Sequence, residues 1–280
     1  MPCHVSDELR GWRWREPPLL NPYRVRVNAS DLSFDCGSGR FSFLRHVLRV
    51  RESAGSDLLF GVFVHRVVVA ATTAAKSILY GRRPSSGRMF FDEMMALGRV
   101  LVKEDGFSRF PDVFDSLWSR AAHAYSSALD KVLSVSRYLS WDGVVYRVVP
   151  WICEFPLDGR PLGLHRAVRV DALIPPSVIV EFKTRRPSRL FEVALAGYAL
   201  CFEAQFRVPV DHAVLVYLSF DRDGVCRVYE NFVAVDDALR MEFVERRDLL
   251  LRVAAERFDP GLPPECDRYC PYLKYCRASE

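Results

Sequence analysis

The sequence lacks any run of eighteen apolar residues, any internal repeat and any low-complexity tract. Without such a run, no transmembrane helix is expected. Without repeats or biased tracts, the chain resembles neither a solenoid nor a flexible linker. Residues 1–15 carry Glu, Asp, Arg and Trp in place of an apolar signal core, so secretion is not expected. We therefore expect a globular, cytoplasmic protein with no membrane partner.

Lysine is scarce in this chain. The 39 basic residues include only five lysines, which are Lys76, Lys103, Lys131, Lys183 and Lys274. A lysine inside a polar motif is therefore informative, because arginine cannot easily replace a compact ammonium group. The chain has 280 residues, of which 50% are hydrophobic, and a net charge of +4. This composition is ample for one large core, and the mildly basic balance is compatible with nucleic-acid binding.

The most informative pattern is an aspartate followed ten positions later by Glu-x-Lys. Asp171 ends one apolar run, and Glu181 and Lys183 lie inside the next. Side chains alternate along a strand, so Glu181 and Lys183 share one face of an otherwise apolar strand. The Pro-Pro turn at residues 174–177 predicts a hairpin, and this hairpin brings Asp171 close to Glu181.

Two carboxylates and one lysine on such a hairpin suit a divalent-metal phosphodiesterase. Carboxylate oxygens are the ligands that Mg²⁺ prefers, and a lysine can position or polarise a water molecule. The same residues also fit a plainer interpretation, in which they form a solvated strand face with a cross-strand ion pair. The hairpin alone leaves both interpretations open.

Eight cysteines form two groups. One group lies within or beside apolar runs and is expected to consist of buried small hydrophobic residues: Cys3, Cys153, Cys201 and Cys226. The other group includes a tail triplet after a Pro-Pro break and comprises Cys266, Cys270 and Cys276, with Cys36 as the best fourth member. Four thiolates suit an iron–sulfur cluster or tetrahedral zinc, and the spacing does not separate the two. Free tail thiols, or Cys3 as the fourth ligand, remain alternatives.

The apolar periodicity predicts the following elements. Residues 1–28 form an irregular arm, and Asp31 or Ser33 caps a helix that ends near Arg51. Helices are predicted at residues 58–79, 90–102, 113–136 and 188–206, with a last helix that begins at Asp236 or Asp237. Strands are predicted at residues 144–149, 152–155, 167–174, 178–183, 214–220 and 225–232.

The order of these motifs resembles a known family. Gly61-x-x-x-His65 precedes Asp171 and Glu181-x-Lys183, and Tyr198-Ala199-Leu200-x-x-Glu203 follows on the next helix. Together with Cys36 and the tail triplet, this order is similar to the RecB-like nucleases that carry an iron–sulfur cluster. It is most similar to the CRISPR-associated exonucleases of the spacer-acquisition machinery, in their longer archaeal type I-A variant.

The resemblance implies an α/β fold with a restriction-endonuclease-like PD-(D/E)xK core and a mixed central sheet. It implies Lys183, Glu181, Asp171 and Tyr198 as catalytic residues. The implied Mg²⁺ or Mn²⁺ ligands are His65, Asp171, Glu181 and the backbone carbonyl of Phe182. The implied 4Fe-4S ligands are Cys36, Cys266, Cys270 and Cys276. The implied partners are DNA ends, the CRISPR integrase and other adaptation proteins.

We expect an N-terminal arm and helix at residues 1–57, a nuclease core at 58–232 with a helical insertion at about 82–140, and a C-terminal helix and cysteine tail at 233–280. Arg185, Arg186 and Arg189 directly follow the motif and are expected to contact DNA phosphates.

Three features depart from the family pattern. Ala194 stands where the family carries Gln, Val168 stands where it carries Gly, and the first tail cysteines are separated by three residues instead of two. The leading hypothesis is a metal-dependent DNA exonuclease of CRISPR adaptation. The alternatives are a weakly active or inactive scaffold subunit that binds DNA ends, a RecB-like repair nuclease, and a zinc-ribbon DNA-binding protein.

Overall fold

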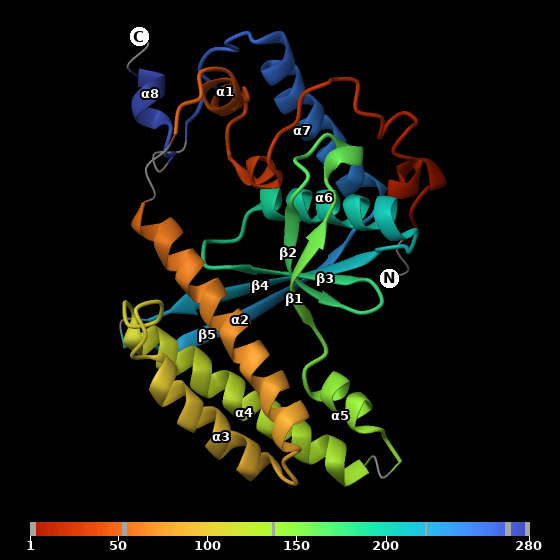
Figure 1. Ribbon diagram of the computed structural model, residues 1–280. Helices are drawn as coiled ribbons and strands as arrows, with labels where there is room; N and C mark the ends of the chain where they lie inside the picture. Colours follow the sequence, from red (N-terminus) through yellow and green to blue (C-terminus); the bar gives the residue numbers. More distant parts are fainter. Residues whose placement is uncertain (1–3, 52–54, 136–137, 222, 267–269, 278–280) are drawn as a thin grey trace.

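The protein is an α/β structure built around one five-stranded mixed sheet, as seen in a computed structural model (Figure 1). The structure describes residues 4–51, 55–135, 138–221, 223–266 and 270–277. The helices are η1 (Asp7–Leu9), η2 (Gly11–Arg13), η3 (Ala29–Ser33), α1 (Arg40–Ser42), η4 (Phe43–Val47), α2 (Ser56–Arg82), α3 (Gly87–Leu101), α4 (Pro111–Val135), α5 (Trp141–Val148), η5 (Arg160–Leu162), α6 (Arg189–Phe206), α7 (Asp237–Glu256) and α8 (Leu273–Arg277). The strands are β1 (Ile152–Leu157), β2 (Val168–Ile174), β3 (Val178–Lys183), β4 (His212–Phe220) and β5 (Cys226–Ala234).

The strands lie in the sheet in their sequence order. Neighbouring strands are antiparallel except β3 and β4, which are parallel. A parallel pair needs a crossover connection, and α6 supplies it. The predicted α/β class with a mixed sheet is therefore confirmed.

Each face of the sheet has its own layer and its own apolar core. On one face, α6 and α7 pack together with the N-terminal arm and the cysteine tail. On the other face, α2, α3, α4 and α5 pack together against the sheet. Figure 1 shows the two layers on opposite sides of the strands, with α2 running past the sheet toward the cysteine tail. The N-terminal arm is irregular as predicted, and it buries Leu9, Leu19 and Val27.

The predicted helix at residues 58–79 is confirmed as α2, the central helix of its layer. It buries Phe63, Val64 and Val67 among other side chains, because its apolar residues recur at helical spacing. By length and composition alone, α2 also qualifies as a candidate membrane span. Core helices can also meet these length and composition criteria, and the central place of α2 in the second apolar core fits a core helix.

The predicted strand at residues 144–149 is wrong. Residues 144–148 belong to α5, and Val149 follows its last turn. The first turn of α5 is capped by the Ser140 hydroxyl, which accepts a hydrogen bond from the Gly143 N–H. Val144, Val145 and Val148 are buried, a spacing that fits one helical face. The β-branched residues suggested a strand by propensity, and packing against α4 and α2 overrode that preference.

The helix predicted from Asp31 or Ser33 to Arg51 is also largely wrong. Asp31 lies in η3, and its carboxylate accepts hydrogen bonds from Asn28 and Arg45. The helical segment begins only at Arg40, directly after Gly39, whose φ of 72° is a left-handed conformation that glycine adopts without strain.

The remaining elements agree with their predictions to within a few residues. The α7 helix is capped by Asp236, whose side chain accepts a hydrogen bond from the Leu239 N–H, as predicted. Ser136, the predicted end of the helix at residues 113–136, lies outside the described residues, as does Cys3. The predicted boundaries of the three parts of the chain stay predictions.

Candidate functional site

The β2–β3 hairpin forms as predicted and presents the motif residues. Ala172 pairs with Val180 and Leu173 pairs with Ile179 in antiparallel register. Val180 and Phe182 belong to the core under α2. Glu181 alternates with them, so it points to the other face of β3, and Lys183 follows it on that face.

At Asp171 and Glu181, hydrogen bonds from backbone N–H groups to side-chain carboxylates replace the backbone hydrogen bonds between the two strands. A carboxylate oxygen of Glu181 accepts a hydrogen bond from the Asp171 N–H at 3.1 Å. A carboxylate oxygen of Asp171 accepts one from the Phe182 N–H at 2.8 Å. The strands therefore separate at this step, and the two carboxylates lie in the opening between them.

His65 and Lys183 complete the group. His65 Nδ1 on α2 lies 3.0 Å from an Asp171 oxygen, although the two residues are 106 positions apart. Lys183 Nζ donates to Glu181 Oε2 at 2.6 Å. The structure thus brings together His65, Asp171, Glu181 and Lys183, as the sequence predicted.

Burial controls the electrostatics of these four groups. The Glu181 side chain is 3% exposed, and this burial raises its pKa to about 7. Burial also acts to raise the pKa of Asp171, but the hydrogen bond and charge of His65 outweigh it and lower that pKa. Burial would lower the pKa of His65 and Lys183, but the carboxylates outweigh it and raise both. A cation bound at the carboxylates would favour the charged form of Glu181 against its burial.

Tyr198 lies on α6, behind the two carboxylates. Its pKa is raised well above the usual value by burial and then by the charges of Glu181 and Asp171. One turn earlier, Ala194 is 5% exposed inside the apolar core. The methyl group of Ala194 offers no polar contact to the site, in contrast to the Gln that the resemblance predicts there.

The predicted ligand Phe182 lies between Glu181 and Lys183 in β3. Its ring is 6.3 Å from the His65 ring and 6.1 Å from the Trp151 ring, in edge-to-face arrangements. These contacts place the Phe182 ring beside His65, and the role of its backbone carbonyl as a ligand stays a prediction.

A cleft of about 1510 Å³ opens onto this group. His65, Lys183 and Arg185 line it, together with Arg45 from the N-terminal segment and Lys274 from the cysteine tail. Pockets for small molecules are usually 300–1,000 Å³, so this cleft is large enough for part of a polymer. Its five cationic side chains, which are Arg45, Arg66, Lys183, Arg185 and Lys274, suit a polyanion.

The three predicted DNA-binding arginines differ in their surroundings. Arg185 and Arg186 are exposed, and neither forms an ion pair with any residue that the structure describes. Arg189 instead binds Glu192 and, through two nitrogens, Glu242. The charge of Arg189 is therefore already matched within the protein.

The four cysteines predicted to form a cluster line one small cavity between the N-terminal loop and the tail. Cys36 and Cys276 are buried, Cys270 is half-buried and Cys266 is exposed. Burial raises the pKa of Cys276, and the nearby Arg40 guanidinium acts in the opposite direction. The other predicted buried thiols behave as expected at Cys201 and Cys226, while Cys153 is half-buried.

Across the described parts of the chain, no three His, Cys, Asp or Glu side chains are already arranged to hold a metal ion. The donor types nevertheless fit the expected groups. Two carboxylates and an imidazole match Mg²⁺ or Mn²⁺, and a bound cation would oppose the burial that raises the pKa of Glu181. The thiols around one cavity match a cluster or zinc.

One residue in the cleft was missed by sequence analysis. Glu154 lies on β1 between Cys153, which pairs with Ala172, and Phe155, which pairs with Val170, so it is opposite Asp171. Its φ of 52° is left-handed, and its side chain lines the cleft with His65 and Lys183. A glutamate is an unusual choice for that conformation, so no local pattern could have revealed it.

Comparisons with known proteins agree over the whole chain. The model of a family described as CRISPR-associated exonuclease Csa1 matches residues 1–279. A protein of Saccharolobus solfataricus named CRISPR-associated exonuclease Csa1 is 34% identical over 284 positions, covering 99% of this chain and 94% of the relative. A protein of Thermoproteus tenax with the same name is 31% identical over 280 positions, covering 99% and 93%.

Proposed function

Because this chain belongs to the Csa1 family of CRISPR-associated exonucleases, we propose that it is a Mg²⁺- or Mn²⁺-dependent DNA exonuclease of CRISPR adaptation. In this role it trims or selects DNA fragments before an integrase inserts them. The observation that carries the proposal is the meeting of His65, Asp171, Glu181 and Lys183 beside a cleft that His65 and Lys183 line together with further cationic side chains.

The order of elements supports a PD-(D/E)xK nuclease core. The elements α2, β1, β2, β3, α6 and β4 follow one another in the αβββαβ order expected for that core, with α3, α4 and α5 inserted after α2. The acidic motif lies on the β2–β3 hairpin, where two neighbouring strands separate.

His65, Asp171, Glu181 and the Phe182 carbonyl are the residues that would hold the catalytic metal. A bound Mg²⁺ or Mn²⁺ supplies Lewis-acid polarisation of the phosphodiester and lowers the pKa of a water molecule. His65 orients Asp171 through their 3.0 Å contact. Lys183, whose pKa is raised, stays protonated at neutral pH and donates hydrogen bonds to the phosphate as negative charge develops. The Glu181 contact at 2.6 Å holds that ammonium group in place.

The cysteine cavity supports a structural 4Fe-4S cluster on Cys36, Cys266, Cys270 and Cys276. Such a cluster joins the N-terminal loop to the tail, and both border the cleft through Phe34, Pro271 and Lys274. Iron content after anaerobic purification tests this assignment. The Cys36→Ser variant should lose bound iron, and full iron in that variant would overturn the choice of Cys36.

The nuclease proposal is tested with end-labelled single- and double-stranded DNA and Mn²⁺. We expect the parent protein to degrade the DNA and Lys183→Ala to be slower by about 10²–10³-fold, the usual loss when one donor to a developing anion is removed. Retained DNA binding by the variant serves as the folding control.

Absence of cleavage by the parent, with DNA still bound, would favour the scaffold-subunit alternative. One observation already points in that direction, because the apolar Ala194 occupies the position of the expected Gln.

A further inference from the structure

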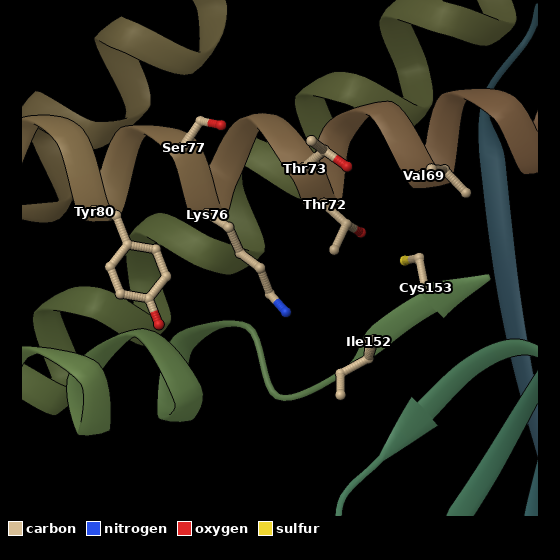
Figure 2. A pocket seen from close by; sticks show the side chains of 8 residues that line it. All are labelled: Val69, Thr72, Thr73, Lys76, Ser77, Tyr80, Ile152 and Cys153. Atoms are coloured by element: carbon tan, nitrogen blue, oxygen red, sulfur yellow. The ribbon is translucent and has the colours of Figure 1, made fainter. Parts of the chain in front are cut away.

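A second cavity lies beyond the cleft, between α2 and the beginning of β1. It has a volume of about 400 Å³, which is enough for one nucleotide-sized group. Figure 2 shows Lys76, Thr72 and Tyr80 projecting from α2 toward the β1 side, with Cys153 and Ile152 opposite them. Nothing in the proposed cutting site uses this cavity.

The cavity adjoins the cleft. Val69, Thr73 and Ser77 line both. Lys76 follows His65 on α2 by eleven residues, which is close to three full turns, so both side chains lie on the same face of the helix. At 1.5 Å per residue, the two positions are about 16 Å apart along the axis. A strand bound at His65 can therefore continue along α2 to Lys76.

The polar wall of the cavity is equipped for an anion. Lys76 Nζ donates to the Trp151 carbonyl at 2.7 Å, which positions the ammonium and leaves its other two N–H groups available. The Thr73 and Ser77 hydroxyls form no hydrogen bond with the residues that the structure describes. The lining contains no carboxylate. The nearby Asp142 carboxylate accepts a hydrogen bond from the Tyr80 hydroxyl.

The opposite wall is suited to a sugar or a base. Ile152 and Cys153 of β1 present apolar surface there, and Val69 of α2 adds to it from the side of Lys76. Cys153 pairs with Ala172, the residue next to Asp171, so this wall begins directly beside the cutting site. The cavity therefore combines one cation with an apolar surface, which is the combination that a phosphorylated nucleotide requires.

We propose that this cavity receives the phosphorylated end of the DNA strand, with the Lys76 ammonium contacting the terminal phosphate. This inference rests on the proposed nuclease function, because it assigns the adjacent part of the same strand to His65 and Lys183. A terminal phosphate carries more negative charge than an internal phosphodiester, so one ammonium in the cavity favours an end over the middle of a strand.

The separation of the two sites also limits the product. A strand that spans about 16 Å contains about five nucleotides at the 3.4 Å rise of stacked bases, and fewer when it is stretched. An end held at Lys76 therefore predicts oligonucleotide products of a few nucleotides instead of mononucleotides.

The test compares single-stranded oligonucleotides of one sequence that carry a 5′-phosphate, a 3′-phosphate or only hydroxyl ends. Their affinities are measured by fluorescence anisotropy in EDTA, so that no cleavage is required. We expect one phosphorylated end to bind about tenfold more tightly than the hydroxyl-ended strand, as a charge-assisted contact allows. Which end shows the preference identifies the polarity of the bound strand.

Lys76→Met should reduce this preference to about one. Lys131→Met is the matched control, because Lys131 is an exposed lysine on α4 outside both cavities. Ser77→Glu is the second variant if Lys76→Met does not fold. It keeps the Lys76 bond to Trp151, adds a carboxylate at an exposed helical position, and should abolish the preference equally.

Equal affinities of the parent protein for phosphate and hydroxyl ends would overturn the proposal, as would an unchanged preference in a folded Lys76→Met or Ser77→Glu variant. A phosphate preference that is lost in these variants, in a parent that cuts no DNA, would support the end pocket and refute the nuclease function.

Discussion

Two glutamates of this protein are almost completely buried, and their surroundings differ sharply. Glu203 on α6 is 0% exposed and accepts five hydrogen bonds. Three come from Arg10 and Arg240, and the others come from the backbone N–H groups of Gly11 and Val210. Glu181 on β3 accepts only from Lys183 and from one backbone N–H, and the Asp171 carboxylate lies beside it.

The comparison separates a structural carboxylate from a functional one. The partners of Glu203 come from the N-terminal arm, α7 and the loop before β4, so this residue joins segments far apart in the sequence to α6. Gly11 makes the closest approach, since a Cβ there would lie 2.1 Å from the Leu200 carbonyl oxygen. Glu181 instead has a pKa that burial raises, and carboxylates with raised pKa values are typical of sites that bind a cation or a substrate.

The largest expected effect is on the structural side of this comparison. Glu203→Ala should reduce the free energy of unfolding by about 3–5 kcal/mol, because it leaves the fully buried Arg240 without its counter-charge. Denaturant unfolding measures the loss. The change should be much smaller for Glu16→Ala, an exposed ion-pair control. A loss below about 1 kcal/mol would contradict the structural role.

Metal binding provides the next largest effect, on the functional side. With Mn²⁺ at a hundred times its dissociation constant, the parent protein should gain about 2.7 kcal/mol of stability. Glu181→Gln should gain little, because the amide is a weaker ligand without charge. Thermal unfolding with and without Mn²⁺ gives the comparison. Equal stabilisation of both proteins would remove Glu181 from the metal site.

The pH dependence of the stability of the metal-free protein tests the raised pKa of Glu181. Glu181 has a pKa of about 7 in the folded protein, against a usual value of 4.5. The folded state therefore takes up this proton more readily than the unfolded state, and stability should fall as pH rises from 4.5 to about 7. The raised pKa of His65 acts in the same direction above pH 6.5.

Glu181→Gln should flatten this fall, while the lowered pKa of Asp171 acts only near and below pH 3.8. Urea unfolding at a series of pH values measures the slope. An equally steep fall in the variant would show that another group causes it.

A smaller effect is expected at Glu154, which borders the functional carboxylates. Glycine adopts a φ of 52° without the strain that a side chain adds. Glu154→Gly should therefore raise the free energy of unfolding by about 0.5–1 kcal/mol relative to Glu154→Ala. Both variants lose the weak 3.5 Å pair with Arg169, so their difference isolates the strain. A less stable glycine variant would contradict this account.

The arginines beside the motif allow a similar comparison, between Arg189, which forms ion pairs with glutamates, and Arg185 and Arg186, which form none with the described residues. Replacing Arg185 and Arg186 with Ala should weaken DNA binding and reduce the slope of log affinity against log salt by about 1–2. Arg189→Ala should change the slope less, because Glu192 and Glu242 already match its charge. Affinity titrations at several salt concentrations measure both. An unchanged salt dependence in the Arg185 and Arg186 variant would show that these arginines do not contact DNA.

The sequence alone predicted the elements whose signals are local. Alternation located β3 and the shared face of Glu181 and Lys183, and the Pro-Pro turn located the hairpin. Helical periodicity located α2, and an aspartate cap located the beginning of α7. Local signals failed at α5, where β-branched residues suggested a strand, and near Asp31, which serves as a buried anchor for Arg45 and His46.

The tertiary structure decided which of these residues meet. It placed His65 on Asp171 across 106 positions and turned Glu203, a motif residue, into the centre of a buried ionic network. It also placed the Lys76 cavity beside the cleft and gave Glu154 its left-handed backbone conformation. The physical reason is that periodicity and capping depend on neighbours in the chain, whereas burial, charge balance and strain depend on the packing of the two layers around the sheet.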